Sequence, residues 1–228
     1  MFSGQIEFEP SATLTSSKRS DQRADDGPDQ NPGQNLDQPF ASQLDFSCHI
    51  SDRLQLRVLQ LRDAPELFAL IDTNRDYLRE WLSWLHTTQT VDDTKHFIRQ
   101  IRRRARNSEG FAAAIFYDNA IAGVIDIHDV TPCDKKASIG YWLAQSEQGK
   151  GLMSNACKAI VDYGFQHLNL NRISILCATG NSRSQAIPKR LGFNYEGTLR
   201  EAQWIETHFV DHEVYSLLRR EWSPFTAE

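Results

Sequence analysis

The sequence predicts an α/β (α+β) fold, built on a mixed sheet of six or seven strands with helices on both faces. Apolar runs and stretches of helical periodicity follow one another in the order β, two or three α, three β, α, β, α, β, β. A glycine-bearing turn over 148–153 separates an apolar run from a helical stretch, as in a strand–turn–helix unit. A chain of 228 residues is long enough to bury a sizeable core.

The first predicted elements are one strand and three helices. Polar and apolar residues alternate over 53–59, which is typical of a half-buried strand. A short helix over 63–71 begins with an aspartate cap and a proline in its first turn. A second helix, rich in Trp and Leu, is expected over 75–85. A third, over 90–107, is expected to begin with Thr90 as its cap and to bury Phe97, Ile98, Ile101 and Ala105.

The rest of the chain predicts the body of the sheet. Asp118-Asn119 is a tight-turn dipeptide, so 111–117 and 120–127 are expected to form a hairpin, and a further strand follows at 137–144. Helices and strands then alternate, and two strands close the fold. These later elements are expected at 152–165, 172–178, 184–190, 193–200 and 209–218.

The two ends of the chain differ in composition from the middle. Residues 1–45 are rich in Ser, Asp, Gln, Asn and Pro, so they are predicted to be a disordered acidic and polar extension. Residues 46–222 are expected to form one domain, followed by a short tail over 223–228. The net charge of −5 lies in residues 1–50, which hold eight acidic and three basic residues. Residues 51–228 hold equal numbers of acidic and basic residues, so the charge of this part does not indicate a nucleic-acid partner.

Composition also narrows the location and the cofactors. The four cysteines form no Cys-x-x-Cys pair and have no histidine at zinc-finger spacing, so no metal site is expected. Neither a membrane-spanning apolar run nor a secretory signal is visible. We therefore expect a cytoplasmic protein, either monomer or homodimer, that does not bind membranes.

The turn over 148–153 is the strongest functional signal. It precedes a helix, so its backbone N–H groups would lie where the helix dipole is positive, which favours a phosphate. Gly149 and Gly151 would let the backbone approach a ligand closely. The alternative is a helix-capping turn with no ligand, because short glycine motifs have many chance matches.

A second segment follows about thirty residues later. Asn181 and Ser184 precede Leu191-Gly192-Phe193, and Ser184 would point the same way as Asn181 once a helix begins. The two segments together suggest an acyl carrier that contains a pyrophosphate. Alternatively, Asn181 and Ser184 only cap the helix that ends before Leu191.

A series of short motifs occurs in a fixed order between 53 and 219: Arg53-Leu-x-Leu-Arg57, Asn74-Arg-x-x-Leu78, Trp81-Leu-x-Trp84, Ile139-Gly-Tyr-Trp-Leu143, Gln148-Gly-Lys-Gly151, Asn181-x-x-Ser184, Leu191-Gly-Phe193, Glu196-Gly197 and Asp211-x-x-x-Tyr215. In these motifs and their order the chain resembles the GCN5-related N-acetyltransferases (GNAT), and within them the RimJ/RimL branch of ribosomal-protein N-terminal acetyltransferases. The resemblance implies a V-shaped split between the parallel strands 137–144 and 172–178, with acetyl-CoA bound in it.

The resemblance also implies which residues hold the cofactor. They are Trp142, Leu143, Gln148, Gly149, Lys150, Gly151, Leu152, Met153, Asn181 and Ser184. Trp142 and Leu143 would offer the pantetheine arm an open strand edge, and Asn181 would hydrogen-bond that arm. The Ser184 hydroxyl would meet the CoA sulfur and stabilise or protonate the thiolate. Met153 departs from the wider family, in which Gly or Ala is common at this position.

The general base is less well defined. RimL-like relatives often carry Glu where this chain has Gln203, and an amide cannot usefully accept a proton. Glu201 is the first candidate, because on a strand it would share a face with Gln203. The alternatives are Glu206, Asp126, His128, His208 or a water chain to one of them.

Other side chains are open to two interpretations. Trp81 and Trp84 lie where relatives place the acceptor wall, but they could equally be core. Cys177 could carry an acetyl group, although a small buried side chain is the better interpretation. The arginines over 99–106 are read as a solvated face, with RNA contact as the alternative. Five histidines show no metal-ligand spacing and are interpreted as ordinary surface or core residues: His49, His86, His96, His167 and His212.

These observations predict an acetyl-CoA-dependent N-acetyltransferase that works by direct attack in a ternary complex. The expected acceptor is a protein N-terminal α-amine, such as that of a ribosomal protein. An α-amine loses its proton more readily than Lys, with a pKa of about 7.7–8.0 against about 10.4. The alternatives are acetylation of a small amine such as a polyamine or aminoglycoside, a non-catalytic acyl-CoA-binding module, and an RNA-binding interaction protein.

Overall fold

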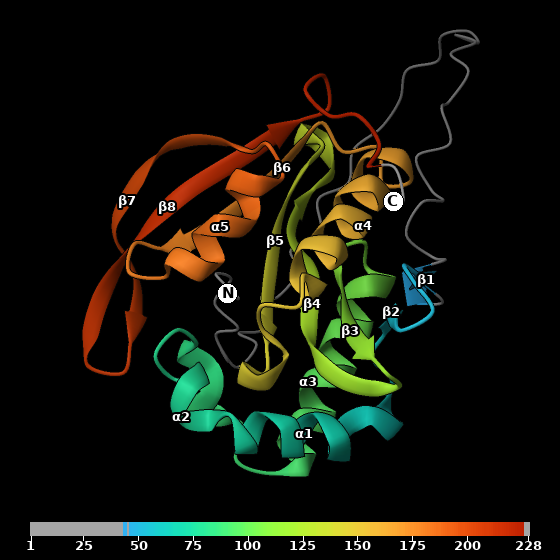
Figure 1. Cartoon of the computed structure of the whole chain (residues 1–228), viewed down its shortest axis with the longest axis vertical. Coiled ribbons are helices and arrows are strands. Elements are labelled where there is room, and N and C mark those ends of the chain that lie inside the picture. Colours follow the sequence, from blue (N-terminus) through green and yellow to red (C-terminus); the bar gives the residue numbers. More distant parts are fainter. Residues whose placement is uncertain (1–42, 45, 226–228) are drawn as a thin grey trace, which may run out of the picture.

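The computed structural model describes residues 43–44 and 46–225, which form one eight-stranded mixed sheet with helices on both faces (Figure 1). The strand order is β1-β2-β3-β4-β5-β6-β8-β7. The predicted fold class is confirmed. The extension expected over 1–45 and the end of the tail expected over 223–228 lie outside the described residues, except for positions 43, 44 and 223–225.

The strands agree closely with the sequence pattern. Their bounds are β1 Ser47–His49, β2 Leu54–Val58, β3 Phe111–Tyr117, β4 Ala120–Thr131, β5 Lys136–Leu143, β6 Arg172–Ala178, β7 Asn194–Ile205 and β8 His208–Leu218. The eighth strand is β1, whose three residues carry no apolar alternation. Asp118 and Asn119 both have positive φ, 50° and 66°, which confirms the tight turn between β3 and β4.

The helices differ from the prediction in two respects: one expected helix is broken in two, and Asp63 does not cap the first helix with its side chain, which bonds Arg57 and the N–H of Gln60 instead. Their bounds are α1 Ala64–Thr73, α2 Arg75–Leu78, α3 Val91–Arg106, α4 Leu152–Gln166 and α5 Ser182–Arg190, with short 3-10 turns that include η3 Ser83–Thr87 and η5 Gln145–Glu147. The single helix expected over 75–85 is therefore wrong. Leu82 is extended, with φ −120° and ψ 107°, and it separates α2 from η3. None of the described helices is both long and apolar enough to cross a membrane.

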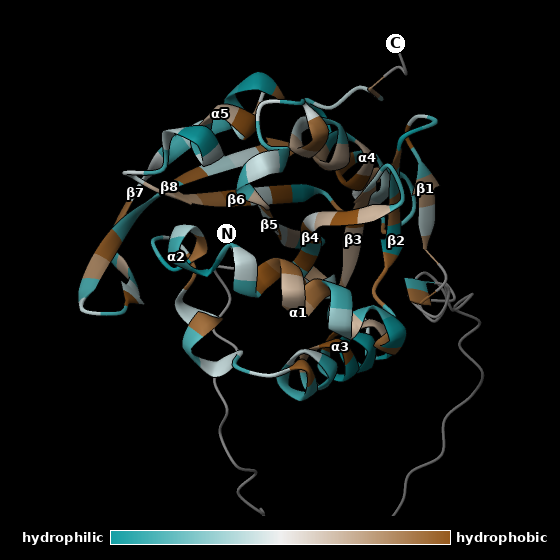
Figure 2. Cartoon of the chain, turned by 60° about the horizontal axis from the view of Figure 1, so that its bottom comes forward, coloured by the Kyte–Doolittle hydropathy of each residue, from teal (hydrophilic) through white to brown (hydrophobic). Residues whose placement is uncertain are grey.

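Two hydrophobic cores lie on opposite faces of the sheet. In Figure 2, α4 and α5 lie above the sheet and α1, α2 and α3 lie below it. The core above contains Cys157, Ile160 and Phe165 of α4, while the core below contains Leu67 of α1 and Ile98 of α3. Capping by Thr90 is confirmed, because its hydroxyl accepts a hydrogen bond from the N–H of Asp93 at 3.2 Å. The sheet is therefore covered by packed helices on both faces.

The centre of the sheet is split. The parallel strands β5 and β6 pair only from Lys136 to Ser138, opposite Arg172 to Ser174. Beyond these residues the two strands have no mutual register, so their carboxyl ends diverge. The expected V-shaped split is confirmed. Because η5 follows β5 and α5 follows β6, both of these elements lie at the open end of the split.

Candidate active site

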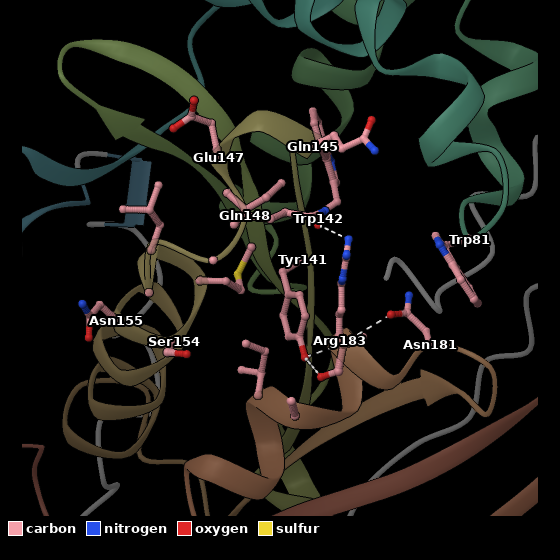
Figure 3. A pocket seen from close by; sticks show the side chains of 18 of the residues that line it. Trp81, Tyr141, Trp142, Gln145, Glu147, Gln148, Ser154, Asn155, Asn181 and Arg183 are labelled. Carbon is pink, nitrogen blue, oxygen red and sulfur yellow. Dashed lines mark hydrogen bonds between the residues drawn. The ribbon is translucent and has the colours of Figure 1, made fainter.

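A cavity of about 940 Å³ lies at the open end of the split (Figure 3). Residues from α2, β5, the turn after η5, α4 and α5 line it. Ten of the sequence-predicted site residues contribute to this wall: Trp81, Trp142, Leu143, Gln148, Gly149, Gly151, Leu152, Met153, Asn181 and Ser184. The cavity has the size and the mixed polar and apolar lining of a small-molecule site. Lys150, Trp84 and Glu201 lie outside the residues that line it.

The glycine turn has the geometry of an anion cradle. Gly149 and Gly151 have φ of 77° and 76°, a backbone region that other residues adopt at a cost. The space where a Cβ would stand is open at both positions. The first helical bond of α4 runs from the N–H of Asn155 to the carbonyl of Gly151, at 3.1 Å. The N–H groups of the preceding turn therefore project from the positive end of α4, and this arrangement fits a pyrophosphate.

Three basic side chains that the sequence prediction missed also line this cavity: Lys158, Arg183 and Arg190. The Nη1 atom of Arg183 donates to Oε1 of Gln148 at 2.6 Å, and Nε2 of Gln148 donates to the hydroxyl of Tyr77. In Figure 3 the Arg183 side chain extends from α5 toward Gln148. This chain of contacts links α5, the glycine turn and α2. Its members are far apart in the sequence, so spacing alone could not reveal it.

Asn181 acts as the N-cap of α5. Its Oδ1 atom accepts a hydrogen bond from the N–H of Ser184 at 2.9 Å. This bond uses the oxygen of the amide, so its NH2 group can also donate to a ligand. The capping and ligand-binding interpretations of Asn181 are therefore compatible.

The Ser184 hydroxyl lies in a small polar cluster beside the cavity. Its Oγ atom is 3.2 Å from Sγ of Cys177 and 3.4 Å from the hydroxyl of Tyr141. Tyr141 also donates to the Ser184 carbonyl at 3.0 Å. Burial raises the pKa of Tyr141 and of Cys177, so both stay protonated near neutral pH. A buried thiol of this kind is a poor nucleophile. This agrees with the interpretation of Cys177 as a small buried side chain and not as an acetyl carrier. Tyr141 was missed because it reads as an ordinary strand residue.

A second cavity, of about 790 Å³, lies between α2, the end of β6 and the β7–β8 hairpin. Trp81 lines both cavities, so the two adjoin at this residue. Trp84 lines neither; it is half-buried and its ring centroid is 6.5 Å from that of Trp142. The structure therefore places Trp81 between the cavities and Trp84 in the packing behind them.

The candidates for a general base are spread over the site. Glu206 and His208 line the second cavity. Glu201 has φ of 51° at a register shift in β7, which breaks the strand alternation between it and Gln203. As a result Glu201 is exposed, lines neither cavity and stays a prediction.

Asp126 and His128 form a buried pair away from both cavities. The Nδ1 atom of His128 is 3.3 Å from the Asp126 carboxylate, which also accepts the N–H of Gly140 at 3.1 Å. Burial disfavours the charged form of His128 and so lowers its pKa. The charge and hydrogen bond of Asp126 act in the opposite direction and prevail, so the pKa of His128 is raised. This pair joins β4 to β5. Within the described residues, no group of three or more His, Cys, Asp or Glu side chains is arranged to hold a metal ion.

A split parallel pair, an anion cradle at a helix start and a cavity with three basic side chains together fit an enzyme that binds a phosphate-bearing cofactor such as coenzyme A. Residues 53–194, more than half of the chain, match a family model described as the acetyltransferase (GNAT) domain. The chain belongs to this GNAT family and is an acetyl-CoA-dependent N-acetyltransferase.

Individual relatives agree with this assignment. YdaF of Bacillus subtilis (strain 168) is 35% identical over 178 residues, which cover 78% of this chain and 97% of that protein. The microcin C7 self-immunity acetyltransferase MccE, in complex with acetyl-CoA and AMP, is 31% identical with a TM-score of 0.71, covering 74% of this chain and 94% of MccE. RimL, a ribosomal L7/L12 alpha-N-protein acetyltransferase in complex with coenzyme A, is 26% identical with a TM-score of 0.73. The match covers 76% of this chain and 98% of the RimL chain. The expected family, fold and cofactor are confirmed.

Proposed function

We propose that this enzyme acetylates the N-terminal α-amine of a protein, a ribosomal protein in particular, by direct attack within a ternary complex. The observation that carries the proposal is that two cavities meet at Trp81. One can hold the coenzyme while the other admits the acceptor, so no acyl-enzyme is needed. The ribosomal acceptor is supported by RimL, which is named a ribosomal L7/L12 alpha-N-protein acetyltransferase.

The first cavity fits acetyl-CoA, which supplies an acetyl group on a thioester. The N–H groups of Gly149, Gly151, Leu152 and Met153 would hold the pyrophosphate, with Arg183, Lys158 and Arg190 as nearby cations. Trp142 and Leu143 lie beyond the residues of β5 that pair with β6. Their backbone groups on that edge would be offered to the pantetheine arm. The Ser184 hydroxyl would stand beside the sulfur and supply a proton there.

The second cavity fits a cationic chain end. One basic side chain, Arg79, lines it and pairs with Asp76 at 3.5 Å, whereas four acidic side chains line it: Asp76, Glu80, Glu206 and Asp211. Their carboxylates would attract an N-terminal ammonium group before its proton is lost. An α-amine has a pKa of about 7.7–8.0, so its deprotonation at neutral pH costs far less than that of a lysine ammonium.

The direct test uses synthetic peptides with ribosomal-protein N-terminal sequences and one internal lysine. With acetyl-CoA, the free peptide should gain one acetyl group at its α-amine, located by fragmentation mass spectrometry. The same peptide with a blocked N-terminus should release no CoA. Acetylation of the lysine alone, or of polyamines or aminoglycosides in place of the peptide, would contradict the proposal.

A further inference from the structure

The ring of His212 is buried on β8 with one nitrogen bonded and one not. Its exposure is 1%, and its Nε2 atom lies 3.1 Å from Oε1 of Gln203. The amide nitrogen of Gln203 in turn donates to the hydroxyl of Ser83 at 3.1 Å. Among the described residues, Nδ1 of His212 has no hydrogen-bond partner. The ring is therefore fixed between β7 and η3, with its second nitrogen left open.

This network assigns the proton of the neutral ring. Because Gln203 donates to Ser83 through its NH2 group, its oxygen accepts from Nε2–H of His212. The lone pair then lies on Nδ1. Burial lowers the pKa of His212, which keeps the ring neutral at physiological pH. A buried acceptor without a donor is destabilising, so an open Nδ1 points to a donor that arrives with a ligand.

The position of His212 relates this open nitrogen to the acceptor. His212 pairs with Ala178 across the β6–β8 ladder and shares a strand face with Val210. Ala178 and Val210 both line the second cavity. Ser83, at the other end of the network, comes two residues after Trp81, which borders both cavities. His212 itself lines neither cavity, but its strand neighbours Val210 and Asp211 and its cross-strand partner Ala178 all line the cavity in which the acceptor is proposed to bind.

We propose that His212 is the proton acceptor for the attacking amine, reached through one bound water molecule. The inference rests on the proposed function. The acceptor ammonium gives one proton through the water to Nδ1, and its nitrogen then bonds to the acetyl carbon. As the carbon–sulfur bond breaks, the sulfur receives a proton from the Ser184 hydroxyl. The second proton of the attacking nitrogen, lost as the amide forms, restores that hydroxyl. His212 then releases its proton to solvent, so one amide, one thiol and one free proton result.

The groups around His212 suit this role. Gln203 and Ser83 are neutral, and Ala178 on β6 is apolar. Asp211, the neighbour of His212 on β8, carries a negative charge. This charge favours the protonated form of the His212 ring. A nearby carboxylate that stabilises the imidazolium helps a histidine to take up a proton.

A His212→Gln variant tests the proposal, because glutamine can still bond Gln203 but has no basic nitrogen. Its rate should fall about 100-fold at about pH 6.5, the lower end of the range for a general base. The deficit should shrink to less than about tenfold at about pH 9, where the α-amine, with a pKa near 8, is already deprotonated. CoA affinity should stay unchanged. The matched control is His49→Gln, which is exposed on β1, lines neither cavity and should keep its activity.

A deficit of equal size at both pH values would mean that His212 only packs, and a retained rate would mean that it has no role. Either result would overturn the inference. The wild-type rate in the same assay tests the proposed function separately. A variant that does not bind CoA is set aside in favour of nitrogen NMR on the native chain with labelled histidine. A bisubstrate analogue made of CoA and a peptide should shift the Nδ1 resonance of His212, and an unchanged resonance would refute the proposal.

Discussion

The hydroxyl of Ser184 is held in a defined place beside the cofactor cavity. It lies 3.2 Å from the Cys177 thiol, which burial keeps protonated by raising its pKa, so the thiol does not compete as a nucleophile. Ser184→Ala should lower kcat about 100-fold, because it removes the proton donor for the thiolate. Calorimetry should show an almost unchanged Kd for CoA.

Ser182→Ala is the control for this change, since Ser182 is exposed in the first turn of the same helix. That variant should keep the wild-type kcat. A Ser184→Ala enzyme with full kcat would show that the hydroxyl takes no part in the chemistry.

The two positive-φ glycines Gly151 and Gly192 form a matched pair, with φ of 76° and 77° and open space at the Cβ position. Gly192 ends α5, where its N–H and that of Phe193 bond the carbonyls of Lys189 and Pro188. An alanine at either site should cost about 1–2 kcal/mol of stability. Only Gly151→Ala should also weaken CoA binding, by about tenfold, because its methyl group would enter the cradle.

Denaturant unfolding and CoA titration on both variants check this prediction. Equal CoA affinities would show that the turn is only a helix cap.

The glycine turn itself could be predicted from sequence, because glycines directly before a helix favour positive φ and allow a ligand to approach the backbone closely. The contacts of Tyr141 and His212 could not, because their partners come from elements that are distant in the sequence.

Among the elements, α5 and the glycine turn are joined by Arg183 and Gln148 across the cofactor cavity. Arg183 lies beside the turn proposed to hold the pyrophosphate, so Arg183→Ala should raise the Kd for CoA about tenfold through loss of charge-assisted hydrogen bonds. The loss should shrink as salt rises, because screening weakens the same attraction in the wild type. Arg99→Ala, on the exposed side of α3, is the control and should bind CoA normally. A salt-independent effect would contradict an electrostatic role.

The outer strands are tied together by Glu196. Its carboxylate accepts from Nη1 of Arg172 on β6 and from the hydroxyl of Ser216 on β8, both at 2.7 Å. These bonds lower the pKa of Glu196 to about 2. Because the folded-state pKa lies below the unfolded one, the stabilisation is complete above about pH 4.5 and is lost as the pH falls toward about 2.

Glu196→Gln should therefore be less stable than wild type at neutral pH, and the difference should vanish at the acid end of this window. Denaturant titrations at several pH values measure it. Glu80→Gln serves as the control, since the described residues give Glu80 no ion pair, and it should match the wild type throughout. A constant difference at every pH would show that packing, and not charge, is lost.

Most elements could be predicted because their apolar periodicity agrees with their final burial. The exceptions have identifiable causes. The break between α2 and η3 arises where Leu82, extended and buried, turns inward to the lower core, and no proline or glycine marks it. The bulge around Glu201 was missed because alternation assumes an unbroken ladder between β7 and β8.

In the whole molecule, the split between β5 and β6 creates the site. Its existence could be predicted, since the order of motifs from 53 to 219 resembles one family. The second cavity could not, because it joins residues from α2, β6 and the β7–β8 hairpin that no sequence pattern connects. The account depends on both cavities being filled at once, with Trp81 between them.

A bisubstrate analogue, in which CoA is joined through its acetyl group to the α-amine of an acceptor peptide, tests this most directly. Isothermal titration should show binding at least about 100-fold tighter than that of CoA alone, since one molecule fills both cavities without a second loss of freedom. Trp81→Ala should remove much of that advantage while leaving CoA binding itself close to normal. An analogue that binds no better than CoA would contradict simultaneous occupancy of the two cavities.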